Sequence, residues 1–242
     1  MIRRRDLLTS TLVLATGGLA GAEFTAAAPP EAAVDAETLL AKVVQAYASL
    51  SSYEDSGSVT PDDGSESPYR ISFTTLYRSP SLFRFAFDTP HPYLPLRYIV
   101  TKYEVGFDGA AAYFVMTPHE KPPQSVPTPN VNMALARATG ISSGSAHNIS
   151  RLLLRDVSGL SILDLVDARL LEDAQINGVE CHAISTQHPR GGEWTLWIEK
   201  DTLLIRKLRT PLGAQDGMFS EEVHDNIRIN QAIDDSRFKI DA

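Results

Sequence analysis

The stretch Asp167–Arg209, DARLLEDAQINGVECHAISTQHPRGGEWTLWIEKDTLLIRKLR, decides the fold of this chain. Much of it alternates apolar and polar residues at the period of two that is typical of β-strands. Asn177-Gly178 separates two such runs and predicts a tight hairpin, because both residues tolerate positive φ. Turn residues at 188–192 and 200–202 divide the remainder. The stretch therefore predicts an antiparallel meander with strands at about 168–175, 179–186, 193–199 and 203–208.

The third of these strands carries one tryptophan on each face. Trp194 shares a face with Leu196 and Ile198, whereas Trp197 falls on the opposite face. A sheet with a large aromatic ring on each side needs cover on both sides or a concave interior to fill. The pattern therefore favours a strongly curved sheet.

A helix and further strands are expected before the meander. The strongest helical pattern, Glu37–Leu50, places Leu40, Val43 and Tyr47 on one stripe, and Asp35 is positioned to cap its start. Alternating patterns then predict strands at 53–60, 69–78, 82–88, 98–105 and 111–117, with another at 220–230 after the meander. Helical patterns at 132–139 and 148–156, continued by 160–166, predict an apolar insertion that packs across the open face of the sheet.

The strand at 82–88 is unusually aromatic on one face. Phe83, Phe85 and Phe87 alternate there, and Ile71 and Phe73 alternate in the preceding strand. Such a surface is either the packed interior of a sandwich or barrel, or the wall of a cavity for an apolar ligand. The residues alone leave both interpretations open.

The first 22 residues are typical of an export signal. Arg3-Arg4-Arg5 precedes an apolar run, and Ala20-Gly21-Ala22 is a small-x-small cleavage signal. The pair Arg4-Arg5 before Leu7-Leu8 resembles a twin-arginine signal. The apolar run is shorter than the ~20 residues that span a bilayer, so we expect cleavage rather than a membrane anchor. Residues 23–35, rich in alanine and proline, are expected to form a flexible lead-in.

Charge and cysteine usage limit the partners and the compartment. The formal net charge is −8, and removing three arginines and one aspartate with residues 1–22 makes it −10. This balance argues against nucleic acid and anionic membrane surfaces as main partners. Cys181 is the single cysteine, so no internal disulfide and no acylated anchor after the signal are expected. The mature chain is expected to be soluble in the periplasm.

No constellation of residues indicates catalysis, a metal or a cofactor. Gly140-Ile141-Ser142-Ser143-Gly144 matches the letters of a hydrolase nucleophile elbow, but that motif needs a strand-to-helix turn and a helical pattern precedes it here. The six histidines lack the paired spacing of zinc sites. Paired acids such as Glu221-Glu222 are expected to be solvated. A hydrolase using Ser142 is the least favoured alternative.

Together these features resemble the LolA/LolB-like superfamily of periplasmic lipoprotein carriers. The resemblance rests on AYASLSSY at 46–53, Arg84-Phe85 after Pro80, NGVECH at 177–182, WTLWI at 194–198 and a closing Phe238 segment. It covers most of residues 36–242, which we expect to form a single domain, and it is a spaced pattern rather than a sharp motif. The lid arginine of the Lol carriers has no clear counterpart here. The missing lipobox excludes an outer-membrane-anchored acceptor.

The resemblance implies an α+β, mainly β fold: an open antiparallel β half-barrel covered by a few helices, whose interior holds acyl chains. A lipid or lipoprotein acyl chain would then be the cargo, carried without catalysis. A periplasmic module with a filled barrel that recognises a periplasmic or membrane protein is the alternative. The expected cavity-lining residues are Ile71, Phe73, Phe83, Phe85, Phe87, Trp194 and Leu196, and the expected lid residues are Leu135, Leu152 and Leu154.

Overall fold

The computed structural model describes residues 35–62, 64, 69–91, 94–154, 156–212 and 217–240. The expected export signal and all of the lead-in except Asp35 lie outside these residues. The main compact unit spans Val34–Ala242. Among the described residues, no helix combines the length and the apolar character needed to cross a membrane.

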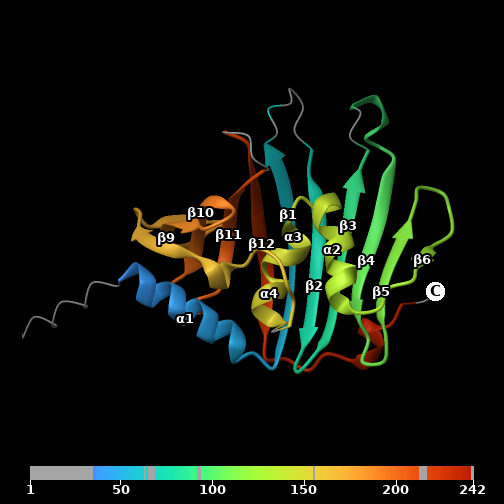
Figure 1. Cartoon of the computed structure of the whole chain (residues 1–242), viewed down its shortest axis with the longest axis horizontal. Helices are drawn as coiled ribbons and strands as arrows, with labels where there is room; N and C mark the ends of the chain where they lie inside the picture. Colours follow the sequence, from blue (N-terminus) through green and yellow to red (C-terminus); the bar gives the residue numbers. More distant parts are fainter. Residues whose placement is uncertain are drawn as a thin grey trace, which may run out of the picture. The chain divides into compact units, whose positions relative to one another are not determined.

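A single antiparallel sheet of twelve strands dominates the described part of the chain (Figure 1). Its order is β6-β5-β4-β3-β2-β1-β12-β11-β10-β9-β7, and β8 pairs with β9 beside this path. The strands are β1 (Ser52–Asp62), β2 (Ile71–Arg78), β3 (Leu82–Pro90), β4 (Val100–Phe107), β5 (Ala112–Thr117), β6 (Gln124–Val126), β7 (Val166–Leu170), β8 (Ala174–Ile176), β9 (Val179–His188), β10 (Gly192–Glu199), β11 (Ile205–Pro211) and β12 (Phe219–Ile229).

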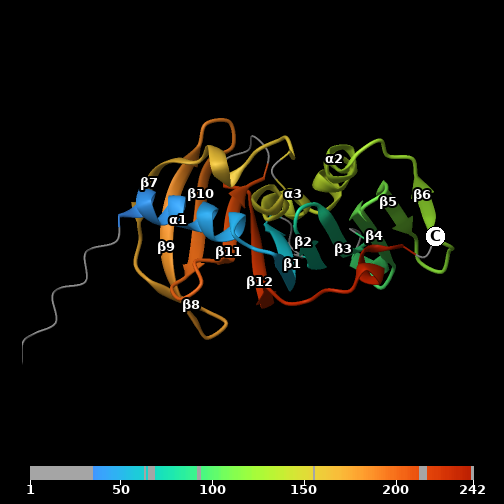
Figure 2. The same cartoon turned by 90° about the horizontal axis from the view of Figure 1, so that it is seen from below.

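The sheet is bent and open, and its helices lie on one face. Strands β6 and β7 stand at opposite ends of the strand order and do not pair with each other within the described residues. In Figures 1 and 2, α3 (Ser145–Asn148) lies near the middle of the sheet, α2 (Val131–Ile141) lies on the side of β4 and β5, against which it packs, and α1 (Ala36–Ala48) runs along the end that carries β9–β11. The expected mainly β, open antiparallel half-barrel covered by helices is confirmed.

Helix α1 forms and docks as its sequence predicts. Asp35 caps it, because its carboxylate accepts a hydrogen bond from the Thr38 N–H at 3.0 Å. Leu39, Val43 and Tyr47 form its buried stripe. The Tyr47 hydroxyl accepts a hydrogen bond from the Ile205 N–H at 3.2 Å, which fastens α1 to the start of β11.

The predicted meander is present, with one correction. Asn177 and Gly178 have φ values of 49° and 83°, so they form the tight turn that their sequence predicts. The first predicted strand, 168–175, is instead divided into β7 and β8, which both pair with β9. The reason is the break at 171–173, where the chain leaves the ladder after the Leu171 N–H bonds the Ala183 carbonyl.

The helical insertion is shorter than the sequence suggests. Helix α2 is confirmed, but the predicted helix 148–156 is replaced by α3 and α4 (Ser150–Leu153). The predicted continuation at 160–166 is wrong, since only the 3₁₀ turn η2 (Ile162–Asp164) forms there. Val166 joins the sheet opposite Gln187, so strand pairing supplies the backbone hydrogen bonds that a helix would have made.

One continuous core fills most of the space between the concave face and the helices. Phe73 and Phe85 stack with ring centroids 5.3 Å apart, and Phe87 stacks on Tyr103 at 4.9 Å. The two tryptophans lie on opposite faces, as predicted. Trp194 is 3% exposed inside the core, whereas Trp197 faces outward and stacks against the Lys207 ammonium at 4.8 Å.

We expect Phe85→Ala to lower the free energy of unfolding by about 3–5 kcal/mol, because the ring is 2% exposed and its removal leaves a cavity. Phe85→Leu should cost clearly less, since it keeps most of the apolar volume. Urea denaturation followed by tryptophan fluorescence measures both losses. A loss below ~1 kcal/mol for the alanine variant would show that this ring adjoins empty space rather than packed atoms.

Candidate functional site

A hollow of about 820 Å³ lies between the helices and one end of the sheet. Its volume falls in the range of about 300–1,000 Å³ that is common for small-molecule sites. Chain turns and helix ends build its wall, namely the end of α1, the β2–β3 and β4–β5 turns, the start of α2, and α4 with the segment after it. The lining residues are Tyr47, Ala48, Tyr77, Ser79–Ser81, Phe107, Ala110–Ala112, Thr128–Val131, Leu152–Leu154, Asp156 and Val157.

The wall of the hollow is amphipathic. Leu152, Leu153 and Val157 supply a buried apolar side, and the alanines of the β4–β5 turn leave room opposite them. Tyr77 and Asn130 are among the polar residues of the wall. The described wall contains no lysine or arginine. Such a surface suits a molecule with an apolar tail and a polar end.

The predicted lid residues divide between the hollow and the core. Leu152 and Leu154 line the hollow and are 7% and 6% exposed. Leu135 is fully buried on α2, a helix that packs against β4 and β5. The three residues therefore belong to the helical cover of the concave face. That this cover opens as a lid stays a prediction.

The predicted cavity-lining residues all point into the concave side but lie beside the hollow rather than around it. They are 0–3% exposed, so no space large enough for water adjoins them, and they belong to the main core: Ile71, Phe73, Phe83, Phe85, Phe87, Trp194 and Leu196. Their contact with a ligand stays a prediction. The sequence patterns did not reveal the hollow because its wall comes from turns, and the small residues at 79–81 and 110–112 were the available signal.

A buried cluster of charged groups joins the sheet to the helical cover. His224 on β12 lies between two carboxylates: its Nδ1 is 2.6 Å from Asp55 Oδ2, and its Nε2 is 3.0 Å from Glu222 Oε1. Asp55 also accepts hydrogen bonds from the Tyr53 hydroxyl at 2.7 Å and the Thr75 N–H at 3.1 Å. A β-bulge between Glu54 and Ser56 accompanies this inward turn of Asp55.

The protonation of this cluster follows from its partners. Burial alone would lower the pKa of His224, but its hydrogen bonds to Asp55 and Glu222 outweigh burial and raise the pKa to about 10. The imidazole is therefore a cation at neutral pH. On the helical side, Asn148 Nδ2 donates to Glu222 Oε2 at 2.6 Å. The cluster thus links β1 and β12 to α3.

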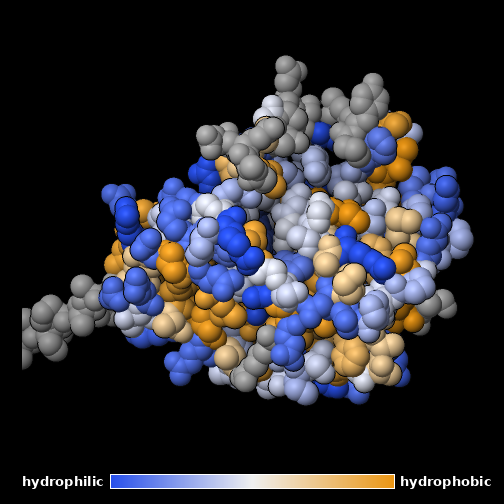
Figure 3. Space-filling model, viewed as in Figure 1, coloured by the Kyte–Doolittle hydropathy of each residue, from blue (hydrophilic) through white to orange (hydrophobic). Residues whose placement is uncertain are grey.

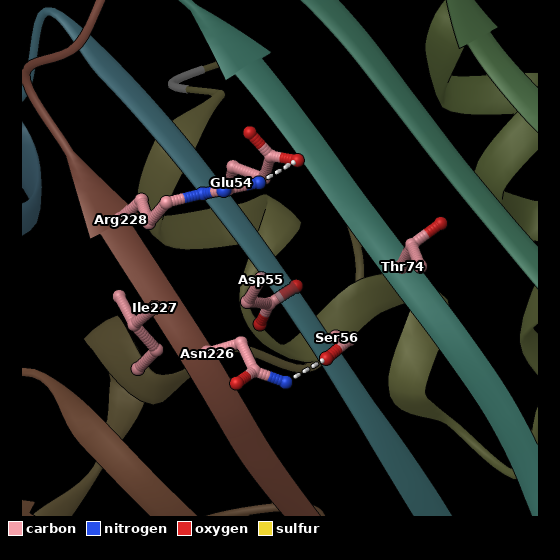
Figure 4. Close-up of a pocket in the computed structure, with 7 residues that line it drawn as sticks. All are labelled: Glu54, Asp55, Ser56, Thr74, Asn226, Ile227 and Arg228. Atoms are coloured by element: carbon pink, nitrogen blue, oxygen red, sulfur yellow. Dashed lines mark hydrogen bonds and ion pairs between the residues drawn. The ribbon is translucent and has the colours of Figure 1, made fainter.

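The outer face of the sheet carries a second, polar hollow of about 450 Å³ near the same bulge (Figure 4). In this hollow the Glu54 carboxylate forms an ion pair with the Arg228 guanidinium at 2.6 Å, and the Asn226 side-chain amide donates a hydrogen bond to the Ser56 hydroxyl at 2.8 Å. Arg237 also pairs with Glu54 at 2.6 Å, and its hydrogen bonds hold the pKa of that carboxyl below its usual value. These groups bind one another, so they tie the 3₁₀ turn at Asp235–Phe238 to the sheet.

Neither a metal-binding cluster nor an exposed nucleophile at Ser142 is found among the described residues. They contain no group of three histidine, cysteine, aspartate or glutamate side chains that could hold a metal ion. Ser142 is fully buried at the end of α2, and its hydroxyl accepts a hydrogen bond from the Ala146 N–H at 3.1 Å. This capping role inside the helical cover differs from an exposed nucleophile on a strand-to-helix turn. His147 bonds Thr139 and the Ser158 carbonyl instead.

Apolar side chains also gather on the surface. On the face that carries the helices, orange patches interrupt the polar surface (Figure 3). The segment 160–171, which contains η2 and β7, contributes large exposed apolar residues, each 43–48% exposed: Leu160, Leu163, Val166, Leu170 and Leu171. None of them lines the hollow.

Comparison with known proteins establishes the fold and leaves the activity open. No protein-family model matches the sequence, and no curated protein matches it either. Among solved structures, LprF from Mycobacterium bovis is 11% identical, with a TM-score of 0.50 over 82% of this chain and 94% of its own. The Mycobacterium tuberculosis lipoprotein LppX is 12% identical, with a TM-score of 0.47 over 83% and 99%.

A LolA superfamily protein, NE2245 from Nitrosomonas europaea, is 10% identical, with a TM-score of 0.33 over 86% of this chain and 99% of its own. At these identities the likeness concerns the fold alone, and of these three structures only LprF reaches a TM-score of 0.50. The open antiparallel sheet covered by helices is the fold that the sequence resemblance implied.

We expect the free energy of unfolding to fall as the pH rises from about 6.5 to about 10. The folded pKa of His224 lies above its unfolded value, so the stabilisation is fully present below the unfolded pKa and is lost as the pH rises through the folded one. Chemical denaturation across this range measures the decline. Cys181→Ala should serve as the background, because burial raises the pKa of that thiol and adds a decline of its own above about pH 9.

The matched comparison measures the pH dependence of stability in two histidine variants, each made in the Cys181→Ala background. His182→Gln changes a histidine that pairs with Asp173 near the surface, and it should leave the decline in place.

Below about pH 9, where tyrosines are still protonated in the unfolded chain, His224→Gln should remove the decline. It should also destabilise the fold by about 3–5 kcal/mol, because two carboxylates lose the cation between them. Nearer pH 10 the buried Tyr47 and Tyr53, whose pKa burial raises, add a decline of their own. A decline that persists below about pH 9 in His224→Gln would contradict the assignment.

Proposed function

We propose that this protein is a non-enzymatic carrier or binder of an amphiphile with an acyl chain. The observation that carries the proposal is the hollow of about 820 Å³ between the sheet and the helices, with a leucine-rich side. Burial of a hydrocarbon tail there contributes about 25 cal/mol per Å² of apolar area removed from water. The resemblance to lipoprotein carriers that the sequence suggests agrees with this use of the concave face.

The hollow explains how a single chain could be held without covalent chemistry. Its buried leucines offer the tail an apolar wall, and its polar groups offer the head group hydrogen bonds. The core residues around Phe73 and Phe85 are packed, so a longer ligand would have to displace the helical cover from them. The predicted cavity-lining set would then form the inner part of an opened site, with Leu135, Leu152 and Leu154 moving as the lid.

A second candidate function is recognition of a periplasmic or membrane protein. The exposed apolar residues between Leu160 and Leu171 favour it, because surface patches of this kind often mark contact sites. The packed central core is also what a filled barrel would show. Native mass spectrometry of the protein purified from its own cell envelope separates the candidates, since a bound lipid supports the carrier and a bound protein without lipid supports the interaction module.

Filling the hollow tests the carrier directly. Ala112 lies in its wall, so Ala112→Trp should reduce the affinity for a fluorescent fatty acid by at least about tenfold, because the indole occupies the space of the tail. Ala136→Trp places the same ring on an exposed position of α2 outside the wall and should bind as the unchanged chain does. Fluorescence titration gives both affinities. Equal binding by the two variants would refute the hollow as the ligand site.

We infer that the chain is exported through the twin-arginine route to the periplasm, on the strength of Arg4-Arg5 ahead of the apolar run. Replacing both with lysine keeps the charge but removes the arginine pair that defines a twin-arginine signal, so it should abolish export by that route. A general secretory signal needs only positive charge at this end and would tolerate the change. Cell fractionation measures the outcome. Unchanged export of the double-lysine variant would assign the chain to the general secretory route.

A further inference from the structure

The hydrogen-bond donors of the hollow include a buried tyrosine with no partner. Tyr77 lies on β2, on the same inward face as Phe73, and is 6% exposed. The residue lines the hollow, and its hydroxyl makes no hydrogen bond with another residue in the described part of the chain. The ring is buried while the hydroxyl stays accessible to solvent. An acceptor placed in the hollow therefore finds a hydroxyl that is free to donate.

A second group of donors comes from the start of α2. This helix has 11 residues, and both its N-cap Asn130 and its first residue Val131 line the hollow. The Asn130 side-chain oxygen accepts a hydrogen bond from the Met133 N–H at 3.0 Å, and the Asn130 carbonyl accepts one from the Ala134 N–H at 3.2 Å. The Val131 and Asn132 N–H groups have no such partner among the described residues, and they carry the partial positive charge of the helix N-terminus.

The charged side chains described near the hollow are exposed. Arg137 donates to the Thr128 hydroxyl at 2.8 Å beside the wall, and Asp156 belongs to the wall itself. Solvent screens the charge of both side chains. We therefore expect the hydrogen-bond donors of the wall to decide the choice of head group, since an ionised acceptor gains about twice as much from a donor as a neutral acceptor does.

We propose that the hollow selects amphiphiles whose head group is a carboxylate, as in a free fatty acid. The carboxylate accepts hydrogen bonds from the Tyr77 hydroxyl and from the Val131 N–H group, which both belong to residues of the wall. The tail lies against Phe107 and the buried leucines of α4. This inference rests on the proposed carrier function and adds the class of ligand to it.

Equilibrium dialysis with radiolabelled lauric acid, lauryl alcohol and methyl laurate tests the inference, because the three share a tail and differ in the head group. With the pH held above neutrality, laurate should bind at least about tenfold more tightly than the other two. Tyr77→Phe removes one oxygen atom and should weaken laurate binding about tenfold while changing the binding of the ester less. Tyr103→Phe makes the same change on β4, outside the wall, and should leave laurate binding unchanged.

A second variant tests the helix terminus independently. Val131→Pro removes one N–H at the first position of α2, where proline is tolerated, and the extended Asn130 with φ −162° and ψ 169° is compatible with a following proline. Val131→Ala keeps the N–H and accounts for the loss of the side chain. Laurate should bind the proline variant several-fold more weakly than the alanine variant.

The outcomes distinguish the two proposals. Equal affinity for acid, alcohol and ester, or unchanged laurate binding in both Tyr77→Phe and Val131→Pro, would overturn the head-group assignment and leave the carrier intact. Failure of all three ligands to bind the unchanged chain would overturn the carrier function itself. Circular dichroism of each variant shows that a loss of binding comes from a folded protein.

Discussion

Burial of the concave face of an open sheet is the constraint on which this structure depends. A bent antiparallel sheet of this size exposes a broad apolar surface unless something covers it. Inward rings such as Phe73, Phe85 and Phe87 contact one another on this face, and they share one core with the buried sides of α1 and α2. The helices are short and two have only four residues, so packing on the sheet rather than their own propensity stabilises them.

The hollow arises where this packing ends. Along the centre of the sheet, aromatic rings reach the helices and leave no room beside them. At the end with the β2–β3 and β4–β5 turns, small residues such as Ser81 and Ala112 replace them, and the chain cannot fill the space below α4. The hollow and the packed core thus belong to the same concave face, and they differ in the size of the side chains that cover it. That continuity gives a ligand in the hollow a route toward the deeper face if the cover moves.

The ion cluster gives this cover a fixed register on the sheet. A cation between two carboxylates is costly to bury, and the carboxylates are further stabilised by hydrogen bonds from Tyr53, Thr75 and Asn148. Hydrogen bonds have strict geometry, whereas apolar packing tolerates sliding. The bond from Asn148 to Glu222 therefore sets where α3 sits, and with it the position of α4 at the hollow. Movement of the cover requires this buried bond to break.

The sequence by itself determined the strand pattern, the opening helix and its cap, the turn at Asn177-Gly178 and the opposite faces of Trp194 and Trp197, because periodicity and turn chemistry are local. It also indicated a LolA-like architecture. Tertiary structure decided the rest. Val166 left its helical pattern because β9 offered an edge to pair with, Glu222 is buried rather than solvated because α3 packs above it, and the hollow formed from turns that are distant in sequence. Such features depend on which segments meet in space, and no local pattern encodes that meeting.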